Sequence, residues 1–197
     1  MSLESGRRRV IGDPVAMRAL AHPLRLKLHA LVGREGTMTA ATAARALGIS
    51  QALASHHLRQ LGKYGFVEQA GRSDNRERPW RVTAVSQDWE PGETAEGHEG
   101  LSMLERFVLE RSAAQLAEWQ QRRPEMDSRW SEHTGVSQNL AYLTVDELAE
   151  LHRAWEALIS PWVQRRPLGD TASRPEGAVP IDITLIIAPL PLTASGG

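Results

Sequence analysis

The side chains best suited to binding chemistry lie on the outer face of a helix that we expect to begin at Ser50. At 100° per residue, the inner face collects small and aliphatic side chains together with His57, which we interpret as a packing residue. The outer face carries short hydrogen-bonding groups and bases: Gln51 at its edge, Ala52, Ser55, His56, Arg59 and Lys63. Arginine pairs with guanine and glutamine with adenine, so this face suits a recognition helix in a major groove. We predict base-edge contacts from Gln51, Ser55, His56 and Arg59, and a phosphate contact from Lys63.

A second group of cations follows in a polar stretch between two short apolar runs. Residues 65–69 and 80–83 are expected to be strands, and residues 71–79 (GRSDNRERP) the tip of the hairpin that joins them. Cations at such a tip would meet phosphates or the minor groove. This role falls to Arg72, Arg76 and Arg78. For each of these residues, and for each residue of the outer face, the alternative is ordinary solvated surface.

The elements that must position these side chains can be read from capping residues. Thr39 is a plausible N-cap for a helix that ends at Leu47, and Gly48 then tolerates the left-handed conformation of a helix C-terminus. Ser50 is an N-cap for the next helix. Helix, tight turn, helix and hairpin follow one another in the order of a winged helix.

These residues also carry a resemblance. The segments ALAHPLRLKLHALV, ALGISQALASHHLRQLGKYGFVE and RERPWRVT resemble the ArsR-like winged helix-turn-helix transcriptional regulators, above all an actinobacterial branch with a long C-terminal extension. The match covers residues 13–84, and its extension is similar through YLTVDELAEL and the closing Pro-Leu-Pro. The resemblance implies that the helix after the wing forms a homodimer and that the protein is a repressor. Two recognition helices related by a two-fold axis would bind double-stranded DNA at an imperfect palindrome.

We therefore expect an α+β protein in four parts. Residues 1–12 are a flexible N-terminal arm, 13–84 the winged helix-turn-helix domain, 85–98 a linker, and 99–197 a dimerisation and effector domain. A long dimerisation helix over 99–123 opens the last part. A small strand-helix-strand extension follows, with strands at 138–143 and 179–188 flanking a helix opened by the capping box that begins at Thr144.

The charge is divided unevenly between the two halves of the chain. Residues 1–83 hold 14 Lys/Arg against 6 Asp/Glu, a balance of +8, and residues 84–197 hold 9 against 18, a balance of −9, which together give the net −1. A basic nucleic-acid domain joined to an acidic, non-binding domain would show this division. The alternative is a chance split across a linker.

Composition and motifs also bound the function. Without cysteine there is no thiolate metal site or cysteine nucleophile, and no paired histidines suit a metal on the dimerisation helix. We find no phosphate loop, Gly-x-Ser-x-Gly elbow or His-Glu-x-x-His, so we expect no enzyme, no cofactor and no metal. No apolar run reaches the length of a membrane span, which predicts a cytoplasmic protein without membrane contact.

The extension raises the question of a small-molecule effector. Most of the tryptophans lie beyond the wing, and Trp119, Trp130 and Trp155 are candidates for a ligand pocket. Ordinary packing in a core or subunit interface is the favoured alternative. Two other functions remain open: a DNA-binding protein without a ligand, and a winged helix used for protein–protein contacts.

Overall fold

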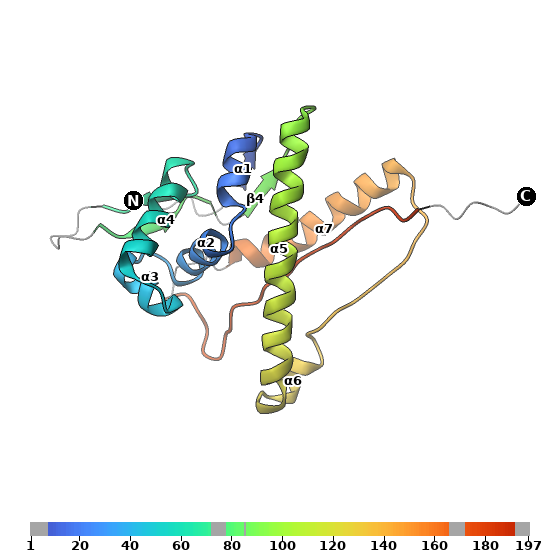
Figure 1. Cartoon of the computed structure of the whole chain (residues 1–197). Coiled ribbons are helices and arrows are strands. Elements are labelled where there is room, and N and C mark those ends of the chain that lie inside the picture. The colour runs from blue at the N-terminus through green and yellow to red at the C-terminus, as the bar shows by residue number, and fades with distance from the viewer. Residues whose placement is uncertain (1–7, 72–77, 85, 166–171, 192–197) are drawn as a thin grey trace, which may run out of the picture.

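The computed structural model describes residues 8–71, 78–84, 86–165 and 172–191 of the 197-residue chain. A helical body lies at one side of a long helix, and a further helix extends beyond it (Figure 1). The elements of the body are β1 (Arg8–Ile11), α1 (Pro14–Leu20), α2 (Pro23–Glu35), α3 (Ala40–Leu47), α4 (Gln51–Lys63), β2 (Val67–Gln69), β3 (Trp80–Val82) and β4 (Ser86–Trp89). The remainder consists of α5 (Ala95–Arg122), the 3-10 helix η1 (Arg123–Glu125), α6 (Ser128–Ser131) and α7 (Val145–Arg165).

The helices of the body begin where their capping residues dictate. The Asp13 carboxylate accepts from the Val15 N–H, and Pro14 occupies the first turn of α1, where no N–H is needed. At the start of α2 the ring Nδ1 of His22 accepts from the Leu24 N–H at 3.1 Å, an arrangement the sequence did not suggest. Each of these two helices therefore has a defined start.

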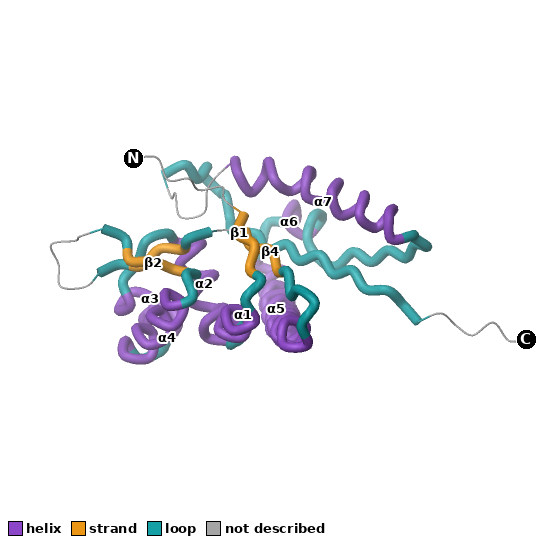
Figure 2. Tube along the Cα trace, turned by 90° about the horizontal axis from the view of Figure 1, so that it is seen from above, coloured by secondary structure: helices purple, strands orange, loops and turns teal. Residues whose placement is uncertain are grey.

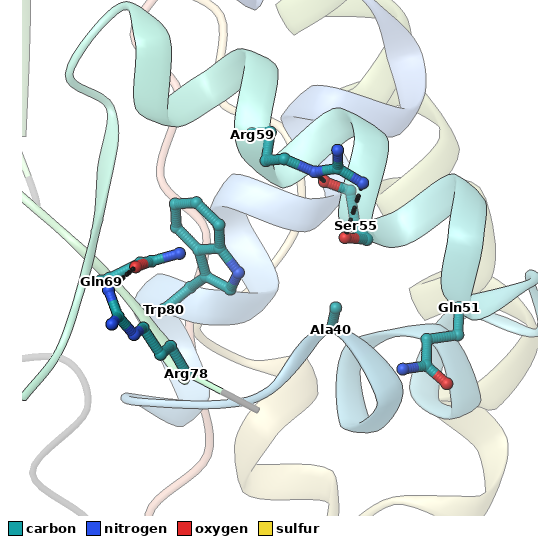
Figure 3. Close-up of a pocket in the computed structure, with 7 residues that line it drawn as sticks. All are labelled: Ala40, Gln51, Ser55, Arg59, Gln69, Arg78 and Trp80. Atoms are coloured by element: carbon teal, nitrogen blue, oxygen red, sulfur yellow. Dashed lines mark hydrogen bonds between the residues drawn. The ribbon is translucent and has the colours of Figure 1, made fainter. Parts of the chain in front are cut away.

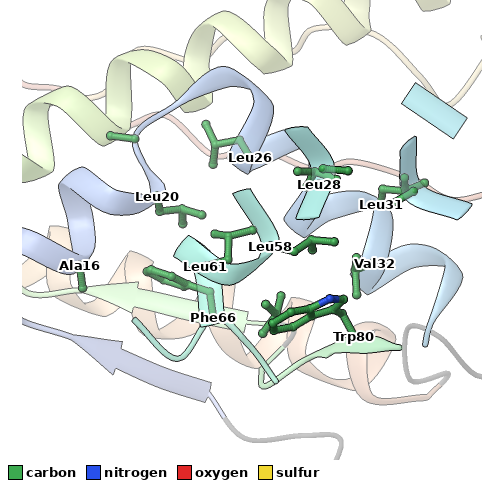
Figure 4. Packing of buried hydrophobic residues seen from close by; sticks show 14 of the residues in the cluster. Ala16, Leu20, Leu26, Leu28, Leu31, Val32, Leu58, Leu61, Phe66 and Trp80 are labelled. Atoms are coloured by element: carbon green, nitrogen blue, oxygen red, sulfur yellow. The ribbon is translucent and has the colours of Figure 1, made fainter. Parts of the chain in front are cut away.

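One hydrophobic core joins the helices of the body to the hairpin. The strands β2 and β3 pair antiparallel, with Val67 opposite Val82 and Gln69 opposite Trp80. Their inner residues meet α2 and α4 in a cluster that includes Leu28, Val32, Leu58, Leu61, Phe66 and Trp80 (Figure 4). Burying each large aliphatic side chain stabilises the fold by roughly 1.5–3 kcal/mol, so this cluster holds the helix pair and hairpin together. The order α3, turn, α4, β2, β3 confirms the predicted winged helix.

The predictions of a flexible arm and of a linker are wrong where these two segments pair with each other as strands. Residues 8–11 form β1, which runs parallel to β4 with Arg8 opposite Ser86 and Ile11 opposite Trp89. Helix α5 begins at Ala95, where Thr94 Oγ1 accepts from the Gly97 N–H, rather than at residue 99. Neither strand shows a hairpin signal in the sequence, since the two segments lie more than seventy residues apart.

The C-terminal extension contains the predicted helix without the predicted strands. Thr144 and Glu147 form the expected capping box, in which the Thr144 N–H donates to Glu147 Oε2 at 2.7 Å and the Glu147 N–H donates to Thr144 Oγ1 at 3.3 Å. The ranges 138–143 and 179–188, both described in full, are extended segments outside any sheet. An alternating pattern predicts an extended backbone, but a strand also needs a hydrogen-bonded neighbour, and the extension offers neither segment one.

Candidate nucleic-acid interface

Helix α4 is held by its neighbours so that one face looks outward. Ser50 Oγ accepts from the Leu53 N–H at 3.2 Å, and Gly48 closes α3 in the left-handed conformation at φ 64°. Alanines on α3 and α4 are buried where the two helices meet, which allows close approach (Ala43, Ala44 and Ala54). The turn and the small contact residues were both predicted from the sequence.

The outer face of α4 has the predicted membership. Gln51, Ala52, His56, Arg59 and Lys63 are exposed and Ser55 is half-buried, whereas Leu58 and Leu61 are fully buried. His57 lies on the inner face with 7% of its surface exposed, as expected of a packing residue. The side chains predicted to bind therefore reach solvent together on one helix.

Arg59 is tied to its own helix. Its Nη2 donates to Ser55 Oγ at 3.1 Å and its Nε donates to the Ser55 carbonyl oxygen at 3.2 Å (Figure 3). A guanidinium has five N–H donors, so others remain for a bound group. Ser55 thereby restricts the rotamers of the one arginine on the outer face.

The wing completes a polar groove beside α4. The groove has a volume of about 320 Å³ and is lined by Ala40, Gln51, Ser55, Arg59, Gln69, Arg78 and Trp80 (Figure 3). Arg78 Nη1 donates to Gln69 Oε1 at 3.3 Å, which places the guanidinium of the wing across from α4. Of the predicted site residues, Gln51, Ser55, Arg59 and Arg78 come together here.

Three residues of this groove were missed by the sequence analysis. Gln69 and Trp80 are paired across β2 and β3, and Ala40 begins α3. Counting back from the expected tip at 71–79 places Ala70 opposite Trp80, one residue away from the observed pairing with Gln69. No signal in the sequence pointed to Ala40, whose position depends on how α3 packs beside the wing.

Trp80 forms the floor of the groove through a close approach to α4. A Cβ added at Gly62 would lie 2.9 Å from Trp80 Cζ3, closer than side chains tolerate. Trp80 itself is 8% exposed, so its ring has little freedom to move aside. Glycine at position 62 thus allows the hairpin to dock against the recognition helix.

The C-terminal end of α4 is anchored by the first strand. Arg9 of β1 donates through Nη2 to the Tyr64 carbonyl oxygen at 3.0 Å and through Nη1 to the Gly65 carbonyl oxygen, and its guanidinium lies 5.3 Å from the centre of the Phe66 ring. A cation is favourable where a helix exposes its last carbonyl groups. Arg9 is therefore engaged in structure, which the flexible-arm prediction did not foresee.

The surroundings of His29 and of His57 lower the pKa of their imidazole rings. Burial, and then the charges of Arg111 and Arg9, lower the pKa of His29 to about 4, and the ring bonds Gln87 Nε2 at 3.1 Å. Burial, followed by the charges of His22, Arg25 and His56, lowers the pKa of His57, whose ring centre lies 4.8 Å from that of His22. His29 is consequently neutral at physiological pH.

The predicted wing residues Arg72 and Arg76 and the predicted ligand-pocket tryptophans are not among the described residues that line the groove. Arg72 and Arg76 lie outside the described residues. Trp119, Trp130 and Trp155 occupy three different helices, α5, α6 and α7, and each is half-buried. Within the described ranges, no group of three or more His, Cys, Asp or Glu residues could hold a metal ion, and no helix is long and apolar enough to cross a membrane.

One stretch of the chain, which includes the helix pair, is similar to a known domain. Residues 20–70 match a family described as a helix-turn-helix domain. No curated protein matches the chain.

Similar solved structures include proteins from two mycobacteria. One is a homodimeric winged helix-turn-helix DNA-binding domain of Mycobacterium bovis described as a possible ArsR-family regulator, with 22% identity, 66% of this chain and 89% of that chain covered, and a TM-score of 0.33. A crystal structure of a possible transcriptional regulatory protein from M. bovis has 26% identity, coverages of 52% and 92%, and a TM-score of 0.32. The structure of RV1404 from Mycobacterium tuberculosis has 16% identity, coverages of 74% and 82%, and a TM-score of 0.30. Residues 20–70 thus form a helix-turn-helix domain, and together with the hairpin of β2 and β3 they form a winged helix-turn-helix.

Proposed function

We propose that this chain is a dimeric, sequence-specific DNA-binding transcriptional regulator, and by its resemblance a repressor. The observation that carries the proposal is the groove between α4 and the wing, which Arg59, Gln51 and Arg78 line. Arginine and glutamine are the side chains that read guanine and adenine in the major groove. A positive balance confined to the half that contains this groove supports DNA as the ligand.

A dimer gives this proposal its geometry. Two copies of α4 related by a two-fold axis would enter successive major grooves about 34 Å apart, so the operator would be an imperfect palindrome. Helix α5 is the candidate for the dimer contact: it is 28 residues long, and its buried residues, Gly97, Gly100 and Leu104, lie in its first ten positions. None of the later residues of α5 is buried in the single chain.

The decisive experiment is a titration of the full chain against the DNA upstream of its own gene. Fluorescence anisotropy at physiological salt should give saturable binding to that duplex and weaker binding to a duplex of the same composition in scrambled order. Equal affinity for both duplexes would remove sequence-specific regulation. A protein-binding winged helix, the alternative function, would bind neither duplex.

A response to a small non-metal ligand is a further part of the proposal. The indole Nε1 of Trp119 is shielded from solvent and has no hydrogen-bond acceptor among the described residues. Buried polar groups are normally paired, so a ligand with an acceptor at this point would gain a hydrogen bond. A metabolite screen by tryptophan fluorescence should then find a compound whose effect is lost in Trp119→Phe, and a flat screen would indicate regulation without a ligand.

A further inference from the structure

Over residues 181–184, the extended segment near the C-terminus turns its polar side toward the protein and its apolar side away. Asp182 Oδ2 accepts from Arg111 Nη2 at 3.0 Å, and the Thr184 hydroxyl bonds Ser112 Oγ at 2.9 Å. The alternate positions Ile181 and Ile183 are 56% and 58% exposed. Alternation on a strand at a protein surface normally has the opposite sense, with the apolar residues inward. This inversion indicates that something covers the outer side.

Helix α7 also leaves much of its apolar surface exposed. Its apolar stripe follows a spacing of three and four residues, yet none of its 21 residues is buried. Leu151 is 48% exposed, Leu158 60% and Trp162 65%. Figure 2 shows α7 along one side of the molecule, separated from α1 and α5 by extended segments. An amphipathic helix gains its stability chiefly by burying such a stripe, and in the single chain the stripe of α7 is at most half-buried.

We propose that a second copy of this chain buries the outer stripe of α7 and the apolar side of residues 179–190. This inference rests on the proposed function, because it extends the dimer contact that starts on α5. The six side chains that carry it are Leu151, Leu158, Trp162, Ile181, Ile183 and Leu185. All six are between 43% and 65% exposed, so each offers apolar area toward the ~800 Å² that a partner contributes to a standard interface.

A second copy is favoured over other occupants by continuity and by charge. Arg111 and Ser112 fasten the segment to the half of α5 that has no buried residue, so the open faces of α5 and of the segment adjoin. The acidic balance of residues 84–197 disfavours DNA or an anionic membrane surface. A copy of the same chain offers an apolar face of equal extent, which makes the contact self-complementary about a two-fold axis.

Sedimentation of four full-length proteins tests the proposal. The wild-type chain should be a dimer, and Leu158→Glu and Ile183→Glu should each weaken the dimer at least about tenfold, because a two-fold interface would bury two unpaired carboxylates. Ala149→Glu is the matched control: it adds the same charge to the exposed opposite face of α7 and should leave the dimer unchanged. A monomeric wild type overturns the proposal, as does a dimer that either substitution leaves intact.

Thiol reactivity provides a second measurement that is independent of the charge changes. The chain has no cysteine, so Leu158→Cys and Ala149→Cys each introduce a single thiol. In the dimer, a maleimide should modify the thiol at 158 at least about tenfold more slowly than the thiol at 149. Equal rates overturn the proposal. The core contains no residue of α7, so thermal unfolding of the body serves to check that each variant is folded.

The same proteins separate this inference from the proposed function. A wild type that dimerises through this face without binding the upstream DNA would end the regulator proposal and leave the inference standing. If the dimer binds the upstream DNA specifically and neither Leu158→Glu nor Ile183→Glu weakens the dimer, the inference is overturned and the regulator proposal stands.

Discussion

Arg59 is positioned before any ligand arrives, because Ser55 accepts two of its N–H groups. A preorganised side chain loses less rotamer entropy on binding than a free one. Both Ser55 and Arg59 were predicted to read bases, and the structure adds that they are hydrogen-bonded to each other.

Replacing Arg59 by alanine should weaken DNA binding at one base pair of each half-site. For operators with the preferred base at that position, the expected loss of binding free energy is about 1–3 kcal/mol. Operators with another base there should be bound with little change in affinity. Ser55→Ala should give a smaller loss at the same position. A panel of operators substituted one base pair at a time would measure this, and a uniform loss across the panel would show that Arg59 contacts phosphate.

His29 links protein stability to pH. Its pKa is about 4 in the folded chain and 6.5 as the ordinary value, so the unfolded chain binds more protons between these limits. The contribution of His29 to the free energy of unfolding should therefore be fully present above pH 6.5 and be lost as the pH falls toward 4. The contribution approaches about 3 kcal/mol. The lowered pKa values of His22 and His57 act in the same direction.

Denaturant unfolding of the wild type and of His29→Gln over pH 4–7.5 would check this contribution. The variant keeps a hydrogen-bonding side chain near Gln87 but cannot titrate. Its stability should change less steeply with pH than that of the wild type. Parallel curves would place the pH dependence in other groups.

At the scale of elements, the α4–wing unit depends on the absence of a side chain at position 62. Gly62→Ala should destabilise the fold by about 1–2 kcal/mol, because overpacking against Trp80 outweighs the roughly 1 kcal/mol gain in helix propensity. The companion substitution Trp80→Phe provides a smaller ring. Chemical denaturation of the double-mutant cycle should show that Gly62→Ala costs less in the Trp80→Phe background. Equal costs in both backgrounds would mean that the ring moves aside.

Local signals explain which elements could be predicted. Ser50 and Gly48 define the ends of their helices by their own chemistry, so the winged helix could be read from the sequence. The outer face of α4 followed from helical spacing alone. The groove could be predicted only in part, because Ala40 enters it through the packing of α3 against the wing.

Elements that depend on distant partners could not be predicted in the same way. The pairing of β1 with β4 joins segments that carry no hairpin turn between them. The expected strands at 138–143 and 179–188 alternate correctly, but alternation does not supply a neighbour. Sequence periodicity thus identifies extended backbone and leaves its pairing open.

At the scale of the whole molecule, the uneven charge predicts how binding should respond to salt. Each phosphate contact contributes about −0.9 to the slope of log K against log salt concentration. Lys63→Ala should therefore reduce the slope by about 0.9. Lys27→Ala removes the same charge from an exposed position on α2 and should leave the slope unchanged. Affinities measured between 50 and 300 mM salt would separate the two variants, and equal slopes would remove Lys63 from the phosphate-binding set.

The strand pair β1–β4 has a consequence for operator architecture. Arg9 connects β1 to the end of α4, and β4 leads into α5, so hydrogen-bonded strands stand where a flexible connection was expected. In a dimer formed through α5, these hydrogen bonds would fix the distance and the relative rotation of the two winged helix-turn-helix domains. Inserting a single base pair between the half-sites should then weaken binding sharply. A domain on a flexible linker would instead rotate to reach the displaced half-site, and binding would change little.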